Sequence, residues 1–146
     1  LMAALLALVF VFGLFSGSDT EEVTPKTKVS VLFNPDGTRT PLKSDTPLIL
    51  QINFNRVIGM GDLSIDKIRT LLDESQSKPL KKGRVKALFL NINSPGGGAF
   101  DSDGIYRLIS EYKKKFGVPI YAYTDKILAS GGYYIAVAAD KIYSSN

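Results

Sequence analysis

Segments patterned like β-strands alternate with segments of helical spacing along most of this chain, and this alternation restricts the folds that it can adopt. Strand-like apolar runs occur at residues 48–54, 85–92, 119–124 and 141–144. Apolar residues at helical spacing occur between these runs, over residues 64–74, 101–116 and 130–139. Such an order predicts an α/β domain with a parallel sheet and right-handed crossovers.

Composition narrows the chemistry available to this domain. The 146 residues include no histidine and no cysteine, and 45% of them are apolar. That length and apolar content suit one domain with a real core. A Ser-His-Asp triad, a His-rich zinc site, a disulfide and a thiol nucleophile are all excluded within the chain. Any catalysis here must use hydroxyl, amine, carboxylate or backbone groups.

The first 18 residues carry no charge and are almost purely apolar up to Phe15. We expect residues 1–18 to be a transmembrane signal anchor with a truncated start, because the chain opens on Leu rather than Met. A cleaved signal peptide and a buried soluble helix are the alternatives, and the lack of a clean Ala-x-Ala site favours the anchor. Residues 19–28 have the composition of a polar linker, and residues 29–146 are expected to form the domain.

A glycine-rich loop, NSPGGG at residues 93–98, follows the strand-like run 85–92 directly. Three consecutive glycines are entropically unfavourable, so they indicate a place where backbone N–H groups approach a ligand closely. The carboxyl edge of a parallel sheet is a usual position for such a site. A simple tight turn is the alternative interpretation. A phosphate loop is a further one, although the Gly-Lys-Ser/Thr ending is missing.

A serine lies between the strand-like run 119–124 and the apolar run that follows it. Ser130 precedes two glycines and would stand at a helix N-terminus, where free N–H groups favour negative charge. Together with the N–H groups of Gly97 and Gly131, its hydroxyl would form a minimal acyl-transfer site. An ordinary N-cap is the alternative role for this serine. The Gly-x-Ser-x-Gly motif of the α/β-hydrolases is absent at this serine, because residue 128 is Leu.

The stretches NINSPGGGAFDSDGIYRLI and VPIYAYTDKILASGGYYIAVAADKIY closely resemble the signal peptide peptidase A family, also called protease IV. The resemblance covers about residues 48–144. It implies a ClpP/crotonase-like fold of repeated β-β-α units with a parallel sheet. It also implies a membrane anchor and the hydrolysis of peptide bonds, notably in signal peptides left in the membrane after cleavage.

Carried over by position, the resemblance makes Ser130 the nucleophile and Gly97 an oxyanion donor, and the N–H of Gly131 stays the candidate for the second donor. The residues expected to contact substrate by strand addition are Gly96, Gly98, Ala99 and Phe100.

The general base of this family is a lysine, which suits a chain without histidine. We expect it beyond Asn146, because neither Lys126 nor Lys141 matches the family's base. Residues 29–146 would then be the N-terminal part of the peptidase domain, inactive alone.

The resemblance also implies a set of partners. We expect peptide substrates, membrane contact through residues 1–18 and a homo-oligomer, with no cofactor, no metal and no nucleic acid. The location would be a bacterial-type inner membrane, crossed once, with the catalytic domain on the extracytoplasmic side. Two alternative functions stay open: a crotonase-like acyl-CoA enzyme, and a non-catalytic peptide-binding member of the same fold.

Overall fold

The strands and helices were located in a computed structural model, which describes residues 34–39, 43, 45–77, 80 and 83–145. The elements in chain order are β1 (Leu48–Phe54), η1 (Gly61–Leu63), α1 (Ile65–Glu74), β2 (Val85–Ile92), α2 (Ala99–Phe116), β3 (Ile120–Thr124), α3 (Gly131–Ala136) and β4 (Lys141–Ser144). The expected anchor, linker and first apolar run, over residues 1–33, lie outside the described residues. Within the described part, no helix has the length and apolarity needed to cross a membrane.

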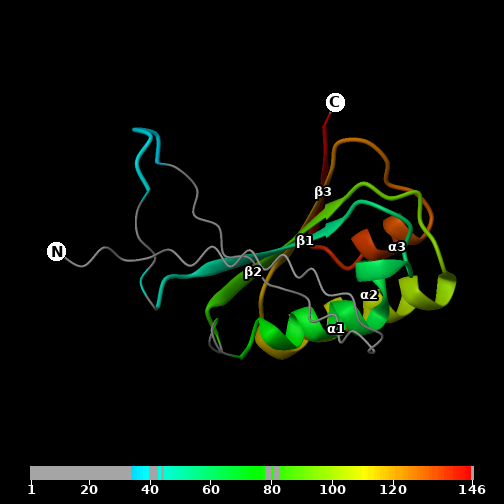
Figure 1. Cartoon of the computed structure of the whole chain (residues 1–146), viewed down its shortest axis with the longest axis horizontal. Helices are drawn as coiled ribbons and strands as arrows, with labels where there is room; N and C mark the ends of the chain where they lie inside the picture. The colour runs from blue at the N-terminus through cyan, green and yellow to red at the C-terminus, as the bar shows by residue number, and fades with distance from the viewer. Residues whose placement is uncertain (1–33, 40–42, 44, 78–79, 81–82, 146) are drawn as a thin grey trace, which may run out of the picture.

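The four strands form one parallel sheet in the order β1-β2-β3-β4, with the helices gathered beside it (Figure 1). The predicted α/β class with a parallel sheet is therefore confirmed. Between a strand and the next helix, the chain forms isolated parallel bridges, which pair Ile58 with Gly97 and Ser94 with Leu128. In the described part of the chain, these bridges stand where the second strand of a β-β-α unit is expected.

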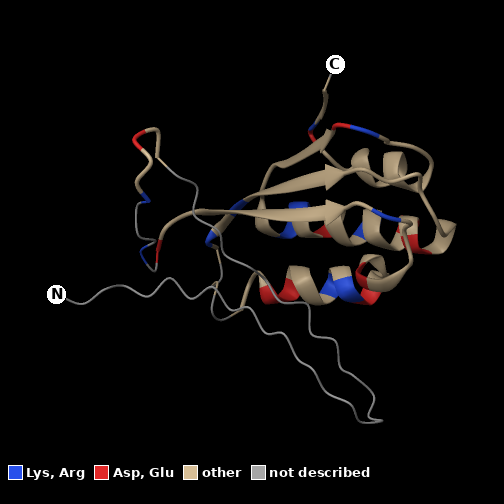
Figure 2. Cartoon of the chain, turned by 45° about the horizontal axis from the view of Figure 1, so that its top comes forward, with Lys and Arg blue, Asp and Glu red and all other residues tan. Residues whose placement is uncertain are grey.

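One face of the sheet forms the core. Leu50, Ile52 and Phe54 of β1 are buried, and their partners on β2 are Leu88, Leu90 and Ile92. The apolar run of β2 suggested burial on both faces, but Lys86 is exposed and Phe89 is half-buried. Charged side chains lie mainly on the helices and loops, whereas the strands are largely uncharged (Figure 2).

Two helices differ from the sequence-based expectation. The helix predicted over residues 101–116 begins two residues earlier, at Ala99, and its N-cap residue Gly98 has no side chain that could cap it. A run that is apolar on all sides, such as residues 133–139, is typical of a fully buried helix, yet Tyr133 and Val137 are more than half exposed. The cause is that α3 spans only six residues and turns one side, with Ile135 and Ala136, into the core.

Asp140, the residue before β4, joins the sheet to α2. Its Oδ2 accepts a hydrogen bond from the N–H of Ile120 at 2.8 Å, and its Oδ1 pairs with the Nζ of Lys113. The Ile120 bond, followed by the Lys113 bond, lowers the pKa of Asp140 below its ordinary value of 3.8. Because the pKa is lower in the folded state, the carboxylate stabilises the fold above pH 3.8, and this contribution is lost as the pH falls through the folded pKa.

We therefore expect Asp140→Asn to flatten the acid side of the stability profile. Between about pH 5 and about pH 2, the free energy of unfolding should fall more steeply in the wild type than in the variant. Urea titrations at each pH measure both slopes. The exposed Asp73→Asn on α1 controls for the loss of one surface carboxylate, and equal slopes in wild type and Asp140→Asn would contradict the assignment.

Candidate active site

Three loops meet at the carboxyl edge of the sheet. The loop after β1 contributes Ile58, the loop after β2 runs from Ser94 to Gly98, and the loop after β3 leads to Ser130. The two isolated bridges join the first loop to the second and the second to the third. Segments about 35 residues apart in sequence are thereby fixed against one another by backbone pairing, which gives a rigid frame for a site.

Ser130 has a strained backbone, with φ 49° and ψ −125°. It is the one non-glycine residue with positive φ in the described part of the chain. It occupies the N-cap position of α3, but its side chain makes no capping hydrogen bond and the residue is exposed. A strained turn between strand and helix is how several hydrolases expose a nucleophilic hydroxyl, and this chain reaches such a turn without Gly-x-Ser-x-Gly.

The glycine loop lies directly against this serine. A Cβ added at Gly96, whose φ is +102°, would stand 2.6 Å from the Cβ of Ser130 and 2.8 Å from the backbone N of Gly131. Real Cβ atoms do not approach so closely. Residue 96 must therefore be glycine for the two loops to touch, and the contact places the Gly96–Gly97 peptide beside the hydroxyl.

The orientation of the Gly97 amide follows from its pairing with Ile58. The carbonyl of Gly96 accepts a hydrogen bond from the N–H of Ile58 at 2.9 Å. In a planar trans peptide the C=O and N–H point in opposite directions, so the Gly97 N–H points away from Ile58. The backbone N of Gly97 lies 3.4 Å from the position of a Cβ at Gly131, which puts the amide next to the start of α3.

The N–H groups of Gly97 and Gly131 share a further property. Over the described ranges, neither one donates a hydrogen bond to a protein acceptor. Two unpaired amides beside one exposed hydroxyl can stabilise the negative oxygen that develops when the hydroxyl attacks a carbonyl. The structure therefore brings Ser130, Gly96, Gly97 and Gly131 together.

The other residues expected to contact substrate lie at the start of α2. Gly98 is exposed but its N–H donates to the carbonyl of Ile58 at 3.1 Å, so it is not available to a peptide. Ala99 and Phe100 form the first turn of α2, and the Phe100 side chain is 82% exposed. No hydrogen bond in the described part of the chain joins Ser130 to the side chain of Lys126 or Lys141.

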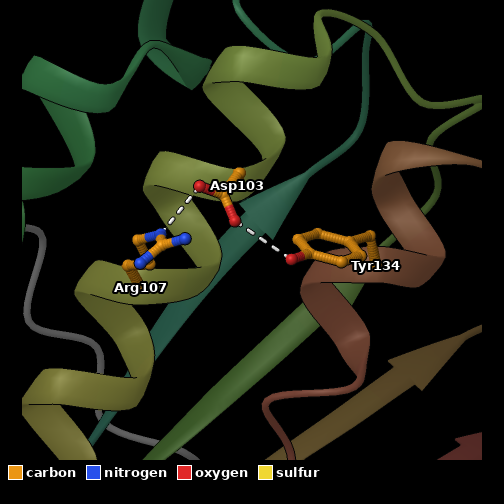
Figure 3. Close-up of polar contacts among 3 residues, drawn as sticks. All are labelled: Asp103, Arg107 and Tyr134. Atoms are coloured by element: carbon orange, nitrogen blue, oxygen red, sulfur yellow. Dashed lines mark hydrogen bonds and ion pairs between the residues drawn. The ribbon is translucent and has the colours of Figure 1, made fainter.

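A polar cluster joins α2 to α3 (Figure 3). The carboxylate of Asp103 accepts a hydrogen bond from Arg107 Nε at 2.7 Å and another from the hydroxyl of Tyr134 at 3.0 Å. The bond from Arg107, followed by the bond from Tyr134, lowers the pKa of Asp103. The bond to the Asp103 carboxylate raises the pKa of Tyr134. Because the N–H of Tyr134 also donates to the carbonyl of Ser130 at 3.0 Å, the cluster fixes the helix that carries the serine.

Two hollows on the surface lie away from the serine. One of about 680 Å³ and one of about 290 Å³ share Tyr106, Ser110 and Lys114 of α2 in their walls. Neither is lined by Ser130 or by the glycine loop. Chemistry at Ser130 would therefore use the open carboxyl edge of the sheet rather than these hollows.

The structure adds residues that the sequence-based prediction missed. Ile58 orients the Gly97 amide through its backbone, which has no side-chain signature in a sequence. Ser94 and Ser102 are buried polar residues of the site, and the hydroxyl of Ser102 donates to the carbonyl of Gly98 at 2.8 Å. A Cβ at Gly131 would stand 2.1 Å from that hydroxyl oxygen, so Ser102 fills the space that a side chain at 131 would need.

Comparison with known proteins points to one family. Residues 112–146 match the model of Peptidase family S49. A protein of Enterococcus faecium that carries the name signal peptide peptidase SppA is 31% identical over 97% of this chain and 44% of its own length. Protease 4 of Haemophilus influenzae is 44% identical over 42% of this chain and 10% of its own. The chain thus spans less than half the length of these relatives.

Two solved structures show weaker likeness. A membrane-bound stomatin-specific protease has a TM-score of 0.48 at 20% identity, covering 70% of this chain and 45% of the other. ClpP1 from Listeria monocytogenes has a TM-score of 0.46 at 23% identity, covering 61% and 46%. The family match and the curated relatives point in the same direction: this chain is similar to the peptidases of family S49 and to relatives named signal peptide peptidase SppA and protease 4.

Proposed function

We propose that this chain supplies the nucleophile and the oxyanion site of a serine peptidase. The observation that carries the proposal is the contact between a strained, exposed Ser130 and two unpaired amides, those of Gly97 and Gly131. The match of residues 112–146 to the model of Peptidase family S49 supports it. The hydroxyl oxygen of Ser130 attacks the carbonyl carbon of a peptide, and the two N–H groups bind the oxygen as it becomes negative.

The proton then follows a defined path. It passes from the Ser130 hydroxyl to a neutral lysine amine and from there to the leaving nitrogen, as the C–N bond of the substrate breaks. Water hydrolyses the acyl-serine and restores the hydroxyl. In this proposal the lysine lies outside residues 1–146, as the family resemblance implies, and partial desolvation keeps it neutral near pH 7.

The proposal also covers the cellular location of the protein and its substrates. Residues 1–18 anchor the protein in a membrane, with the peptidase domain on the extracytoplasmic side, and the uncharged apolar composition of this segment supports the anchor. The substrates are peptides, including signal peptides left in the membrane. Support for that class comes from the name of the Enterococcus faecium relative.

Covalent labelling tests the proposed nucleophile. We expect a fluorophosphonate probe to react with the full-length protein and to leave one phosphonyl group on Ser130, located by peptide mass spectrometry. Activated serines react with such probes because the adduct places an oxygen in the oxyanion site. Labelling of heat-denatured protein is the control and should be absent. Modification at another serine, with Ser130 untouched, would contradict the proposal.

A further inference from the structure

We propose that Ser94 is a positioning residue, whose hydroxyl sets the orientation of the Gly97 N–H that binds the oxyanion; this inference rests on the proposed function. Ser94 is fully buried, with 0% exposure. It lies two residues before Gly96 and touches no reacting atom itself. Its polar groups nevertheless reach all three loops that form the site.

Hydrogen bonds from the backbone of Ser94 hold the loop that leads to Ser130. The N–H of Ser94 donates to the carbonyl of Ile127 at 2.9 Å, and the carbonyl of Ser94 accepts from the N–H of Ala129 at 3.2 Å. A Cβ at Gly132 would stand 3.1 Å from the carbonyl oxygen of Ser94. The start of α3 therefore packs directly on this residue. These backbone contacts would survive a change of its side chain.

The hydroxyl of Ser94 makes the contacts that a substitution removes. Its Oγ donates to the carbonyl of Arg56 at 2.6 Å, which holds the loop after β1, and accepts from the N–H of Gly96 at 3.1 Å. The N–H and the carbonyl of Gly96 are then both fixed, by Ser94 and by Ile58 respectively. With both ends of residue 96 fixed at φ +102°, the plane of the Gly96–Gly97 peptide has one orientation.

Loss of this hydroxyl should lower the catalytic rate more strongly than it lowers the stability of the fold. In Ser94→Ala the carbonyl of Arg56 and the N–H of Gly96 lose their partner. The Gly96–Gly97 peptide keeps its pairing with Ile58 but loses the support at the N–H of Gly96, so its orientation is set less tightly. Misplacing an oxyanion donor by about 1 Å lowers the rate by about 100-fold, because the transition state alone uses it. We therefore expect kcat to fall about 10- to 100-fold with KM changed less than about twofold.

A matched variant separates this role from simple loss of a buried hydroxyl. Ser75 is also fully buried, and its Oγ donates to the carbonyl of Leu72 at 2.6 Å and bonds to the Tyr112 hydroxyl at 2.8 Å, at the far end of α1. Ser75→Ala and Ser94→Ala should lower the Tm of the full-length protein by similar amounts, about 2–8 °C each. Only Ser94→Ala should lower kcat.

The experiment measures kcat and KM on a fluorogenic peptide amide of small apolar residues, and Ki for the matching peptide aldehyde, whose adduct carries an oxyanion. In Ser94→Ala, we expect Ki to rise in parallel with the loss of kcat. Ser94→Cys keeps a weak donor and acceptor, so it should recover part of the kcat and part of the affinity for the aldehyde. If Ser94→Ala does not fold, Ser94→Cys carries the same comparison.

The outcomes are distinguishable. Equal kcat values for wild type, Ser75→Ala and the Ser94 variants would overturn the positioning role while leaving the proposed function intact, provided that Ser130→Ala is inactive. Full activity of Ser130→Ala would instead overturn the proposed function itself. A rise in KM at constant kcat for the Ser94 variants would also contradict positioning, because it would place Ser94 in ground-state binding.

Discussion

Replacing Ser130 by alanine in the full-length protein is expected to lower peptide cleavage by about 10⁴-fold or more, because the nucleophilic oxygen is removed outright. The variant should fold at least as well as the wild type. Its Cβ is retained, the Ser130 hydroxyl makes no hydrogen bond in the described part of the chain, and the backbone strain stays the same. Initial rates on a fluorogenic peptide and thermal unfolding curves measure the two effects separately.

The control for this loss is an exposed serine away from the site. Ser77 follows α1 and donates a hydrogen bond to the carbonyl of Glu74 at 3.2 Å. Ser77→Ala should cleave the peptide at the wild-type rate. If Ser130→Ala cleaved the peptide as fast as that control, Ser130 would not be the nucleophile.

The second large effect is expected at Gly97. A Cβ at this position would stand 2.1 Å from the carbonyl oxygen of Ile58 and 2.6 Å from its backbone N. Both are backbone atoms, so the neighbour cannot rotate away and the glycine loop itself must shift. In Gly97→Ala the paired amides separate, and we expect kcat to fall about 10²- to 10³-fold, the usual cost of losing one oxyanion donor.

Gly117→Ala is the matched control for this substitution. Gly117 ends α2 with φ +63° and has nothing within 4 Å of an added Cβ, so its replacement strains the backbone without touching the site. That variant should lose roughly 1 kcal/mol of stability and keep its kcat. If Gly97→Ala lost no more activity than Gly117→Ala, the Gly97 amide would not be an oxyanion donor.

Most of the fold was predictable because its signals are local. The strand-like runs 48–54 and 85–92 match β1 and β2 residue for residue, since polar, glycine and proline residues bound them clearly. The exposure of α3 was not predictable. A short helix that is apolar on all sides has no amphipathic pattern, so its sequence does not indicate which side faces the core.

The site was predictable in part for a similar reason. Ser130 and the glycines stand out because three consecutive glycines follow one strand-like run and a serine with two glycines precedes an apolar run. The orienting contacts do not stand out: the backbone of Ile58 pairs with Gly97 across about 40 positions, and any apolar residue could do the same. Ser94 lies in a recognisable motif, but its role depends on burial and on Arg56, which only the three-dimensional arrangement reveals.

The meeting of three separate loops at one edge of the sheet has a consequence during synthesis. A growing chain that has completed β1 and β2 holds the glycine loop but not the serine. Once Ser130 has emerged, its strained turn still depends on pairing between Ser94 and the loop after β3. Under the proposed function, the oxyanion site next to Ser130 is therefore complete only after the last of these loops has docked, and a partly synthesised or misfolded copy lacks that site.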